Sequence, residues 1–336
     1  MKPKILIVKT VMSLKDIDSK EGGLFPESHY KNIITSDTDA YGLEDDGTKK
    51  LLFKFRKNVI PNEICTKAYN ALEKHAQKKN YNRGAASGKL NINRLPKHIG
   101  KITKRDSFRI YYKTKDGKPT NDNVGNMALS NIAGYFDKPD RNEYIKLKLM
   151  KLSKTHKKSR KIKKLKTTTN KPGYDLKGVP MCRTTKFTKY EVEKWNNTIP
   201  LIKEADKQFS LLIPDRHKIQ LDRANQTPQF QIAKTAYSTI TVNYNWRTAL
   251  HKDKGDLEEG FGNLLVLEKA KSCNNNCKSY KGGYLGFPRW AICVDVRQGD
   301  FLAMDVHEYH CNTPIEGDGR LSVVCYLRKK MINCKK

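Results

Sequence analysis

A histidine and an aspartate, His251 and Asp253, stand two positions apart at the end of the apolar, β-branched run "TVNYNWRTALHKD". Side chains two positions apart in a β-strand project to the same face, so the pair would share one volume if the strand extends that far. An imidazole nitrogen and a carboxylate oxygen on one face are two ligands of a metal site. A His-x-Asp pair alone is more typical of a polar surface, so a third ligand must decide.

Two further histidines, His307 and His310, follow an apolar strand in "GDFLAMDVHEYHCNTP". Two histidines and one carboxylate occupy one face of an octahedral iron(II) and leave three positions for a bidentate 2-oxo acid and dioxygen. A closed structural zinc site would instead need four protein ligands. The spacing favours an oxygenase-type iron site and leaves both histidines open as the third ligand.

An arginine and a serine alternate at the start of the strand-like run "RLSVVCYLR", where Arg320 and Ser322 share a face. A guanidinium binds a carboxylate through two parallel charge-assisted bonds, so this pair suits the distal carboxylate of 2-oxoglutarate. Asn243, Asn245 and Arg247 have the same parity as the first histidine. They would line the same site, or else they hydrogen-bond to neighbouring strands.

The ordered set "NYNWRTALHKDKGDLEEGFGNL", "GDFLAMDVHEYHCNTP" and "RLSVVCYLR" resembles the TET/JBP family of iron(II)- and 2-oxoglutarate-dependent nucleic-acid dioxygenases. It is most similar to the thymine-hydroxylase domain of the base J-binding proteins, over roughly residues 180–330. The resemblance implies a double-stranded β-helix in which His251, Asp253 and His310 bind iron(II). It also implies that Arg320 anchors 2-oxoglutarate, and we expect Ser322 and Asn243 beside it.

The same resemblance implies hydroxylation of a base methyl group in DNA. Thymine to 5-hydroxymethyluracil is the first expectation and oxidation of 5-methylcytosine the alternative. The methyl group of a paired base lies in the major groove, so the enzyme must flip the nucleotide out of duplex DNA. The stacking aromatic is not evident; Tyr309, Phe287 and Trp290 are candidates, with core packing as the competing interpretation. A protein hydroxylase and a non-catalytic DNA-binding protein are the remaining hypotheses.

The composition is strongly basic, with 66 Lys+Arg against 35 Asp+Glu, a net charge of +31 and a pI near 9.7. Such a surface favours a polyanionic partner, although a lysine-biased genome would also produce it. The expected phosphate contacts are "NRGAASGK", "KITKRDSFRIYYKTK" and the acid-free run 146–166. The sequence thus favours DNA as the partner, and it says nothing of the oligomeric state.

Cysteine usage and hydropathy restrict the class of protein further. The 8 cysteines are scattered and do not resemble the disulfide framework of a small secreted domain. Cys273 and Cys277 form the one close pair, for which a zinc site is a weak alternative. No stretch of about 18 apolar residues predicts a membrane helix, and the start has no signal-peptide core. We therefore expect an intracellular, nuclear location.

Several elements must position these residues. Residues 61–78 have helical spacing after a proline, residues 107–118 read as a strand entering an Asp-Gly turn, and residues 190–208 have a helical pattern interrupted by Pro200. Short β-branched and aromatic runs then follow to the end. This predicts an α+β chain with a jelly-roll, cupin-like core and flanking helices. We expect an irregular lead-in (1–50), a mixed region packing on the core (51–145), a basic linker or arm (146–170) and the dioxygenase core (171–336).

Overall fold

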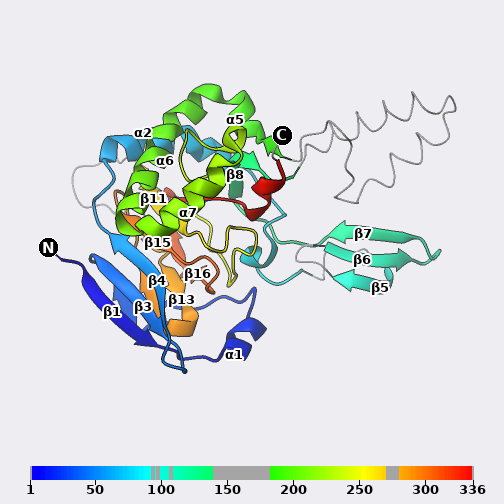
Figure 1. Ribbon diagram of the computed structural model, residues 1–336. Coiled ribbons are helices and arrows are strands. Elements are labelled where there is room, and N and C mark those ends of the chain that lie inside the picture. The colour runs from blue at the N-terminus through cyan, green and yellow to red at the C-terminus, as the bar shows by residue number, and fades with distance from the viewer. Residues whose placement is uncertain are drawn as a thin grey trace.

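The computed structural model describes residues 2–91, 95, 99–105, 109–138, 182–269 and 280–334 (Figure 1). The predicted basic linker 146–170 and the Cys273–Cys277 pair lie outside these residues. Within them, no helix is long and apolar enough to cross a membrane. The described chain is of mixed α and β structure, as expected.

A nine-stranded sheet forms the centre of the molecule, in the order β1-β3-β4-β15-β11-β18-β10-β8-β9. Only the β1–β3 pair among these neighbours is parallel, and the other pairs are antiparallel. The strands are β1 (Lys4–Lys9), β3 (Thr38–Leu43), β4 (Lys49–Arg56), β15 (Phe301–Met304), β11 (Gly262–Glu268), β18 (Arg320–Tyr326), β10 (Thr239–Tyr244), β8 (Ser130–Phe136) and β9 (Arg183–Thr184).

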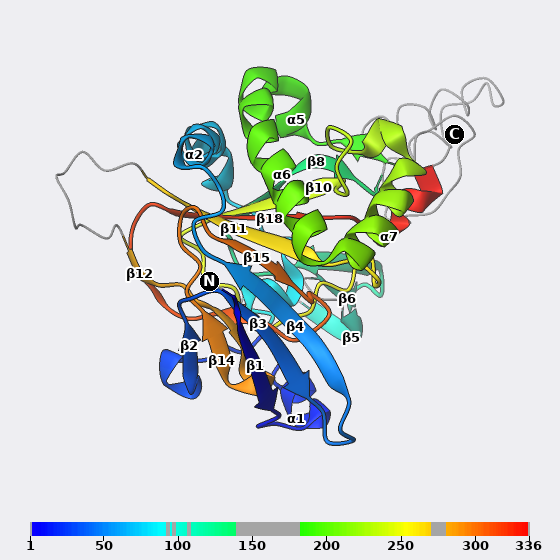
Figure 2. The ribbon, with the colours of Figure 1, turned by 60° about the vertical axis from the view of Figure 1, so that its left-hand side comes forward.

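Helices cover one side of this sheet, as Figure 2 shows. They are α2 (Asn62–Ala76), α5 (Lys186–Tyr190), α6 (Val192–Leu212) and α7 (Pro214–Asn225). The predicted helix after Pro61 is confirmed as α2. The second helical pattern is not interrupted, because α6 continues through Pro200. Leu201 and Ile202 are fully buried in the core beneath the helices, and this packing offsets the hydrogen bond that proline cannot make.

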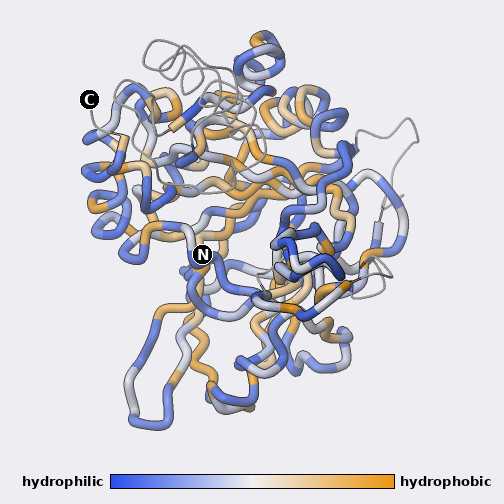
Figure 3. The backbone as a smooth tube through the Cα atoms, turned by 90° about the vertical axis from the view of Figure 1, so that its right-hand side faces the viewer, coloured by the Kyte–Doolittle hydropathy of each residue, from blue (hydrophilic) through white to orange (hydrophobic). Residues whose placement is uncertain are grey.

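A second, smaller sheet lies on the other side of the large one (Figure 2). Its order is β16 (Cys311–Asn312), β13 (Leu285–Phe287), β14 (Ile292–Val294) and β2 (Asn32–Ile34). Between the sheets, one apolar cluster joins β4, β11 and β15 to β13 and β14, with Phe53 and Phe287 stacked at 5.5 Å. Figure 3 shows the apolar residues concentrated along these central strands. β12 (Tyr280–Gly282) and β17 (Ile315–Gly317) form a separate two-stranded sheet, and Tyr280 is buried in the same apolar cluster.

A three-stranded antiparallel sheet projects from the body (Figure 1). It contains β5 (Ile99–Arg105), β6 (Arg109–Thr114) and β7 (Pro119–Asn123). The predicted strand and Asp-Gly turn are confirmed, with Gly117 at φ +73° in the turn between β6 and β7. The sheet has a small core of its own around Ile110, Tyr112 and Val124.

The expected irregular lead-in over residues 1–50 is wrong, because this segment contributes β1, α1 (Leu14–Ser19), β2 and β3 to the fold. The hydrophobic pattern of this segment is weak, since Ile5 and Ile7 of β1 stay largely exposed. The stabilising contacts come from distant segments instead. Gly42 of β3 packs so closely on Trp290 that an added Cβ would lie 2.5 Å from the indole ring. The rest of the four-part division of the chain stays a prediction.

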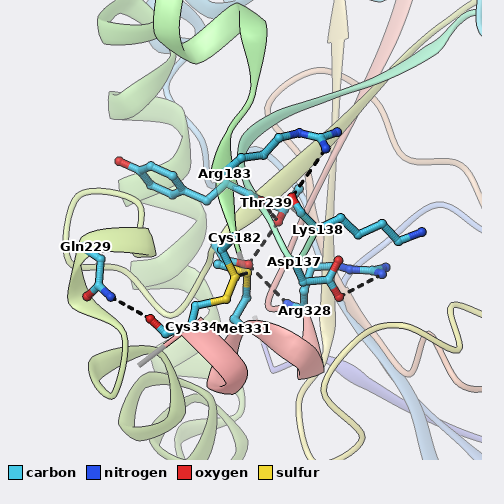
Figure 4. Close-up of a disulfide and its surroundings, with 11 residues drawn as sticks. Asp137, Lys138, Cys182, Arg183, Gln229, Thr239, Arg328, Met331 and Cys334 are labelled. Atoms are coloured by element: carbon cyan, nitrogen blue, oxygen red, sulfur yellow. Dashed lines mark hydrogen bonds and ion pairs between the residues drawn. A yellow bond between two sulfur atoms is a disulfide. The ribbon is translucent and has the colours of Figure 1, made fainter. Parts of the chain in front are cut away.

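Cys182 and Cys334 form a disulfide that joins the start of β9 to the end of the described chain (Figure 4). Both cysteines are buried. The sequence did not predict this bond, because the two residues lie 152 positions apart and neither belongs to a close pair.

Candidate metal centre and co-substrate cavity

Three predicted ligands, His251, Asp253 and His310, converge on one point. The Nε2 atoms of His251 and His310 lie 3.8 Å from Asp253 Oδ1 and Oδ2, respectively, and the two imidazole rings are 4.4 Å apart. All three potential ligand atoms lie within 4.8 Å of one another. Since bonds from a transition metal to histidine and carboxylate are about 2.1 Å long, atoms 3.8 Å apart can share one ion.

The backbone brings the ligands together through long-range pairing. His251 N–H donates to the His310 carbonyl at 3.1 Å, and His310 N–H donates back at 3.0 Å. Asp253 N–H donates to the Val306 carbonyl at 2.9 Å. The segment before the first histidine is fixed by the N-terminal region, where Leu250 exchanges backbone hydrogen bonds with Gly22 and Gly23, each 2.8 Å long.

The expectation that one continuous strand carries these residues is wrong. β10 ends at Tyr244, and Asn245 turns the chain at φ +41°. Asn245 is held there by Arg320, whose N–H donates to Asn245 Oδ1 at 2.8 Å and whose carbonyl accepts from Asn245 N–H at 2.9 Å. Strand alternation therefore does not explain why His251 and Asp253 lie close together.

Both histidines present Nε2 to the metal position. Nδ1 of His251 lies 2.7 Å from the Ala249 carbonyl, and Nδ1 of His310 lies 2.9 Å from the Glu308 carbonyl. A carbonyl only accepts, so each Nδ1 carries a proton, and in the neutral form of the imidazole Nε2 keeps the free lone pair. Burial, together with His310, lowers the pKa of His251 to about 4, which keeps its imidazole neutral near pH 7.

The carboxylate of the trio is ionised. Burial opposes its charge, but the neighbouring His251, His310 and Arg83 hold the pKa of Asp253 below its ordinary value. Asp256 beside it behaves in the opposite way, because burial and the charge of Asp253 raise its pKa well above the ordinary value. Two carboxyl groups three positions apart thus have opposite protonation tendencies.

His307, the competing third ligand, points elsewhere. Its Nε2 lies 3.2 Å from the Leu257 carbonyl, and its N–H donates to Asp305 Oδ1 at 2.9 Å. The structure groups His310 with the other two ligands and leaves His307 out.

Arg320, Ser322 and Asn243 line the same cavity as the three ligands. Arg320 is 1% exposed, and burial lowers the pKa of its guanidinium. Its Nε has no hydrogen-bond partner, and among the described residues no carboxylate lies within ion-pair distance of it. A buried cation without a counter-ion is costly, so this guanidinium is arranged for an anion that enters the cavity.

Asn243 and Ser322 face each other across the β10–β18 pair. The Asn243 Nδ2 donates to Ser322 Oγ at 3.0 Å, while the buried Asn243 Oδ1 has no partner. These polar groups, the two imidazoles and the uncompensated guanidinium form a donor set that fits iron(II) and an anionic 2-oxo acid. One part of the remaining wall is apolar, formed by Leu264, Leu285, Met304, Val306 and Val324.

Several other predicted residues lie away from the cavity. Arg247 donates to the carbonyls of Phe25, at 2.6 Å, and Asn312, at 3.2 Å, and so ties the loop to the N-terminal region. The three candidate stacking aromatics are buried in the core and do not line the cavity: Phe287, Trp290 and Tyr309.

Three charged residues of the cavity wall were not expected from the sequence: Arg83, Asp256 and Arg328. Arg328 forms ion pairs with Asp256 at 3.6 Å and with the buried Asp137 at 3.2 Å, next to the disulfide (Figure 4). Arg83 was expected only as part of the phosphate contact "NRGAASGK". No local signal could have connected it with residues so far along the chain.

Comparison with known proteins places this site in a recognised domain type. Residues 173–329 match the Tet_JBP family model, described as the oxygenase domain of the 2OGFeDO superfamily. The bifunctional helicase and thymine dioxygenase JBP2 of Leishmania infantum is 34% identical over 167 residues, which is 48% of this chain and 14% of that protein. The thymine dioxygenase JBP1 of Trypanosoma brucei brucei is 32% identical over 164 residues, 46% of this chain and 18% of that protein.

The chain therefore covers less than a fifth of the length of either relative. A solved structure described as NgTET1 in complex with 5mC DNA aligns over 97% of this chain and 93% of its own, with a TM-score of 0.46 and 12% sequence identity.

Proposed function

We propose that this chain, whose residues 173–329 form an oxygenase domain of the 2OGFeDO superfamily homologous to thymine dioxygenases, hydroxylates the methyl group of a base in DNA. The observation that carries the proposal is one cavity that brings the candidate metal ligands and Arg320 together. It holds the His251, Asp253 and His310 trio and, on the same wall, the guanidinium of Arg320 without an acidic partner.

Different residues of the cavity would bind the metal and the co-substrate. The Nε2 atoms of the two histidines and one oxygen of Asp253 would hold iron(II), and Arg320 with Ser322 would bind the distal carboxylate of 2-oxoglutarate. Iron(II) bound there supplies the activation of dioxygen, with 2-oxoglutarate as the source of electrons. The apolar wall excludes water from the reacting methyl group, and the Nδ1 hydrogen bonds keep both imidazoles oriented.

A double-stranded β-helix is our proposal for the core. It is supported by the two sheets that face each other across one apolar cluster, and by the position of the ligands on loops at one end of β10 and β15. The strands from residues 4–56 extend the large sheet, so the proposed core is completed by the N-terminal region.

Thymine is the proposed substrate base, since both relatives named above are thymine dioxygenases. The iron position is buried, so a base in duplex DNA must be flipped out to reach it. Arg83, Asp256 and Arg328 supply polar groups on the cavity wall for the edge of such a base. The net charge of +31 suits the phosphates on either side.

Mass spectrometry of nucleosides tests the proposal. The protein is incubated with iron(II), 2-oxoglutarate and a duplex in which either thymine or 5-methylcytosine carries the only methyl groups. We expect 5-hydroxymethyluracil and stoichiometric succinate from the thymine duplex. Product from the methylcytosine duplex alone would reverse the substrate assignment. Turnover of peptides without turnover of DNA would indicate a protein hydroxylase, and DNA binding without any succinate would indicate a non-catalytic protein.

A further inference from the structure

The projecting sheet of β5, β6 and β7 has two chemically different faces. Ile110 and Tyr112 are buried against the small core of the sheet. The residues between them point the other way, because side chains alternate along a strand. We define the basic face as the side chains that share this second orientation: Lys104, Arg109, Tyr111, Lys113, Asn121 and Asn123.

Acidic groups are turned away from the basic face within the described residues. Asp122 pairs with Ile110 and accepts a 2.5 Å hydrogen bond from the Tyr112 hydroxyl on the opposite face. Asp116 lies in the turn after β6. The described part of the basic face therefore carries three cations and two amides without a carboxylate.

The cations of the basic face are interleaved with an aromatic ring. Lys104 Nζ lies 5.7 Å from the centroid of the Tyr111 ring, and Arg109 donates to Asn121 Oδ1 at 2.7 Å. Arg109 and Lys113 stand four positions apart on one strand, about 13 Å. That distance equals the axial rise of about four base-pair steps of duplex DNA. Regularly placed cations with amide donors are typical of a surface that holds a nucleic-acid backbone.

The basic face leads directly to the cavity. Asn123, at the end of β7, donates to Asn82 Oδ1 at 2.8 Å. Arg83, which follows Asn82 in the chain, lines the cavity. Asn126 continues the connection by donating to the carbonyls of Ser87, at 2.9 Å, and Lys89, at 2.8 Å. A backbone that follows the basic face thus arrives at the mouth of the site.

From this juxtaposition, we propose that the β5–β7 sheet is an arm that binds the phosphate backbone of duplex DNA next to the flipped nucleotide. The inference rests on the proposed function for its choice of DNA. Figure 3 views the molecule from the side on which the arm projects. The arm supplies affinity and register for the duplex, while the cavity selects the base.

A charge-matched pair of variants tests the arm. Lys104→Gln/Lys113→Gln removes two exposed cations from the basic face, and Lys203→Gln/Lys218→Gln removes two exposed cations from α6 and α7. Fluorescence anisotropy with a labelled duplex gives Kd at several salt concentrations. We expect Lys104→Gln/Lys113→Gln to bind the duplex at least about tenfold more weakly than wild type at 0.1 M salt. The slope of log affinity against log salt should also become smaller by about 1.8, because each lost phosphate contact removes about 0.9. The control should keep the wild-type slope.

Turnover separates this inference from the proposed function. On a thymine trinucleotide, too short to reach the arm, wild type and Lys104→Gln/Lys113→Gln should have equal kcat and KM; on a duplex the variant should show a raised KM only. Absence of base hydroxylation by wild type would refute the proposed function. The anisotropy measurement would still test whether the arm binds DNA. Equal salt slopes for the two double variants would overturn the arm. If wild type bound duplex RNA as tightly as duplex DNA, and Lys104→Gln/Lys113→Gln lost the same affinity for both, the assignment of the arm to DNA would be overturned.

Discussion

His251 and His310 are joined by two reciprocal backbone hydrogen bonds, of 3.1 and 3.0 Å, although they come from distant parts of the chain. This pairing fixes the separation of the two imidazoles before any ion is bound. The side-chain Nδ1 atoms are fixed as well, each by the carbonyl two positions earlier. Little reorganisation is then needed for metal binding.

Replacement of His310 should weaken metal binding strongly, whereas replacement of His307 should not. His310→Ala removes one of the three proposed ligands, so we expect at least about a 100-fold loss of affinity for Fe(II) or Co(II), more than is typical for the loss of an outer hydrogen bond. His307→Ala is the matched control and should bind metal as wild type does. Titration calorimetry under anaerobic conditions measures both. A greater loss in His307→Ala would refute the ligand assignment.

Replacement of Arg320 should separate co-substrate binding from stability. Arg320→Met removes a buried guanidinium with no acidic partner, so we expect KM for 2-oxoglutarate to rise by about 100-fold as two charge-assisted bonds are lost. Because an uncompensated buried charge is also removed, Tm should stay unchanged or rise. A lower Tm with an unchanged KM would show that the guanidinium serves the fold instead.

The stability of the fold should decrease in mild acid through His75. Burial lowers the pKa of His75 to about 4, with smaller effects from the Ile132 carbonyl, Lys78 and Glu191. The unfolded chain therefore binds a proton that the folded chain does not between about pH 6.5 and 4. The contribution of the neutral His75 to the free energy of unfolding is fully present above about pH 6.5. It is lost as the pH falls through this window, and the loss amounts to up to roughly 3 kcal/mol.

Urea unfolding at several pH values measures this effect. His75→Gln keeps a hydrogen-bond donor for the Ile132 carbonyl without a group that titrates, so its free energy of unfolding should depend less on pH between 6.5 and 4. A pH dependence identical to that of wild type would exclude His75 as its source.

Reduction of the disulfide should lower the stability of the region that carries Arg328. The bond between Cys182 and Cys334 closes a loop of 152 positions, for which chain entropy gives an upper limit of about 5 kcal/mol. Dithiothreitol should therefore lower the Tm of wild type. Cys182→Ser/Cys334→Ser should begin at the lower Tm and should not respond to the reductant; a response equal to that of wild type would assign the effect to other cysteines.

Parts of the fold were predictable because their signals are local. The helix after Pro61 and the Asp-Gly turn at Gly117 follow from residue types within a few positions. The strands of residues 1–50 were not predictable, because their stability comes from partners such as Trp290 and β14, far along the chain. The end of β10 at Tyr244 was also missed, since Asn245 is held at positive φ by Arg320.

The sequence by itself determined the kind of chemistry: two histidines, a carboxylate and an arginine of suitable types, in an order that resembles one family, on a strongly basic chain. Only the tertiary structure decided which charged residues line the cavity wall and that the β5–β7 sheet presents its cations on one face. The reason is physical. Ligand type is a property of each residue, whereas distance, burial and orientation depend on backbone hydrogen bonds between segments that the sequence separates widely.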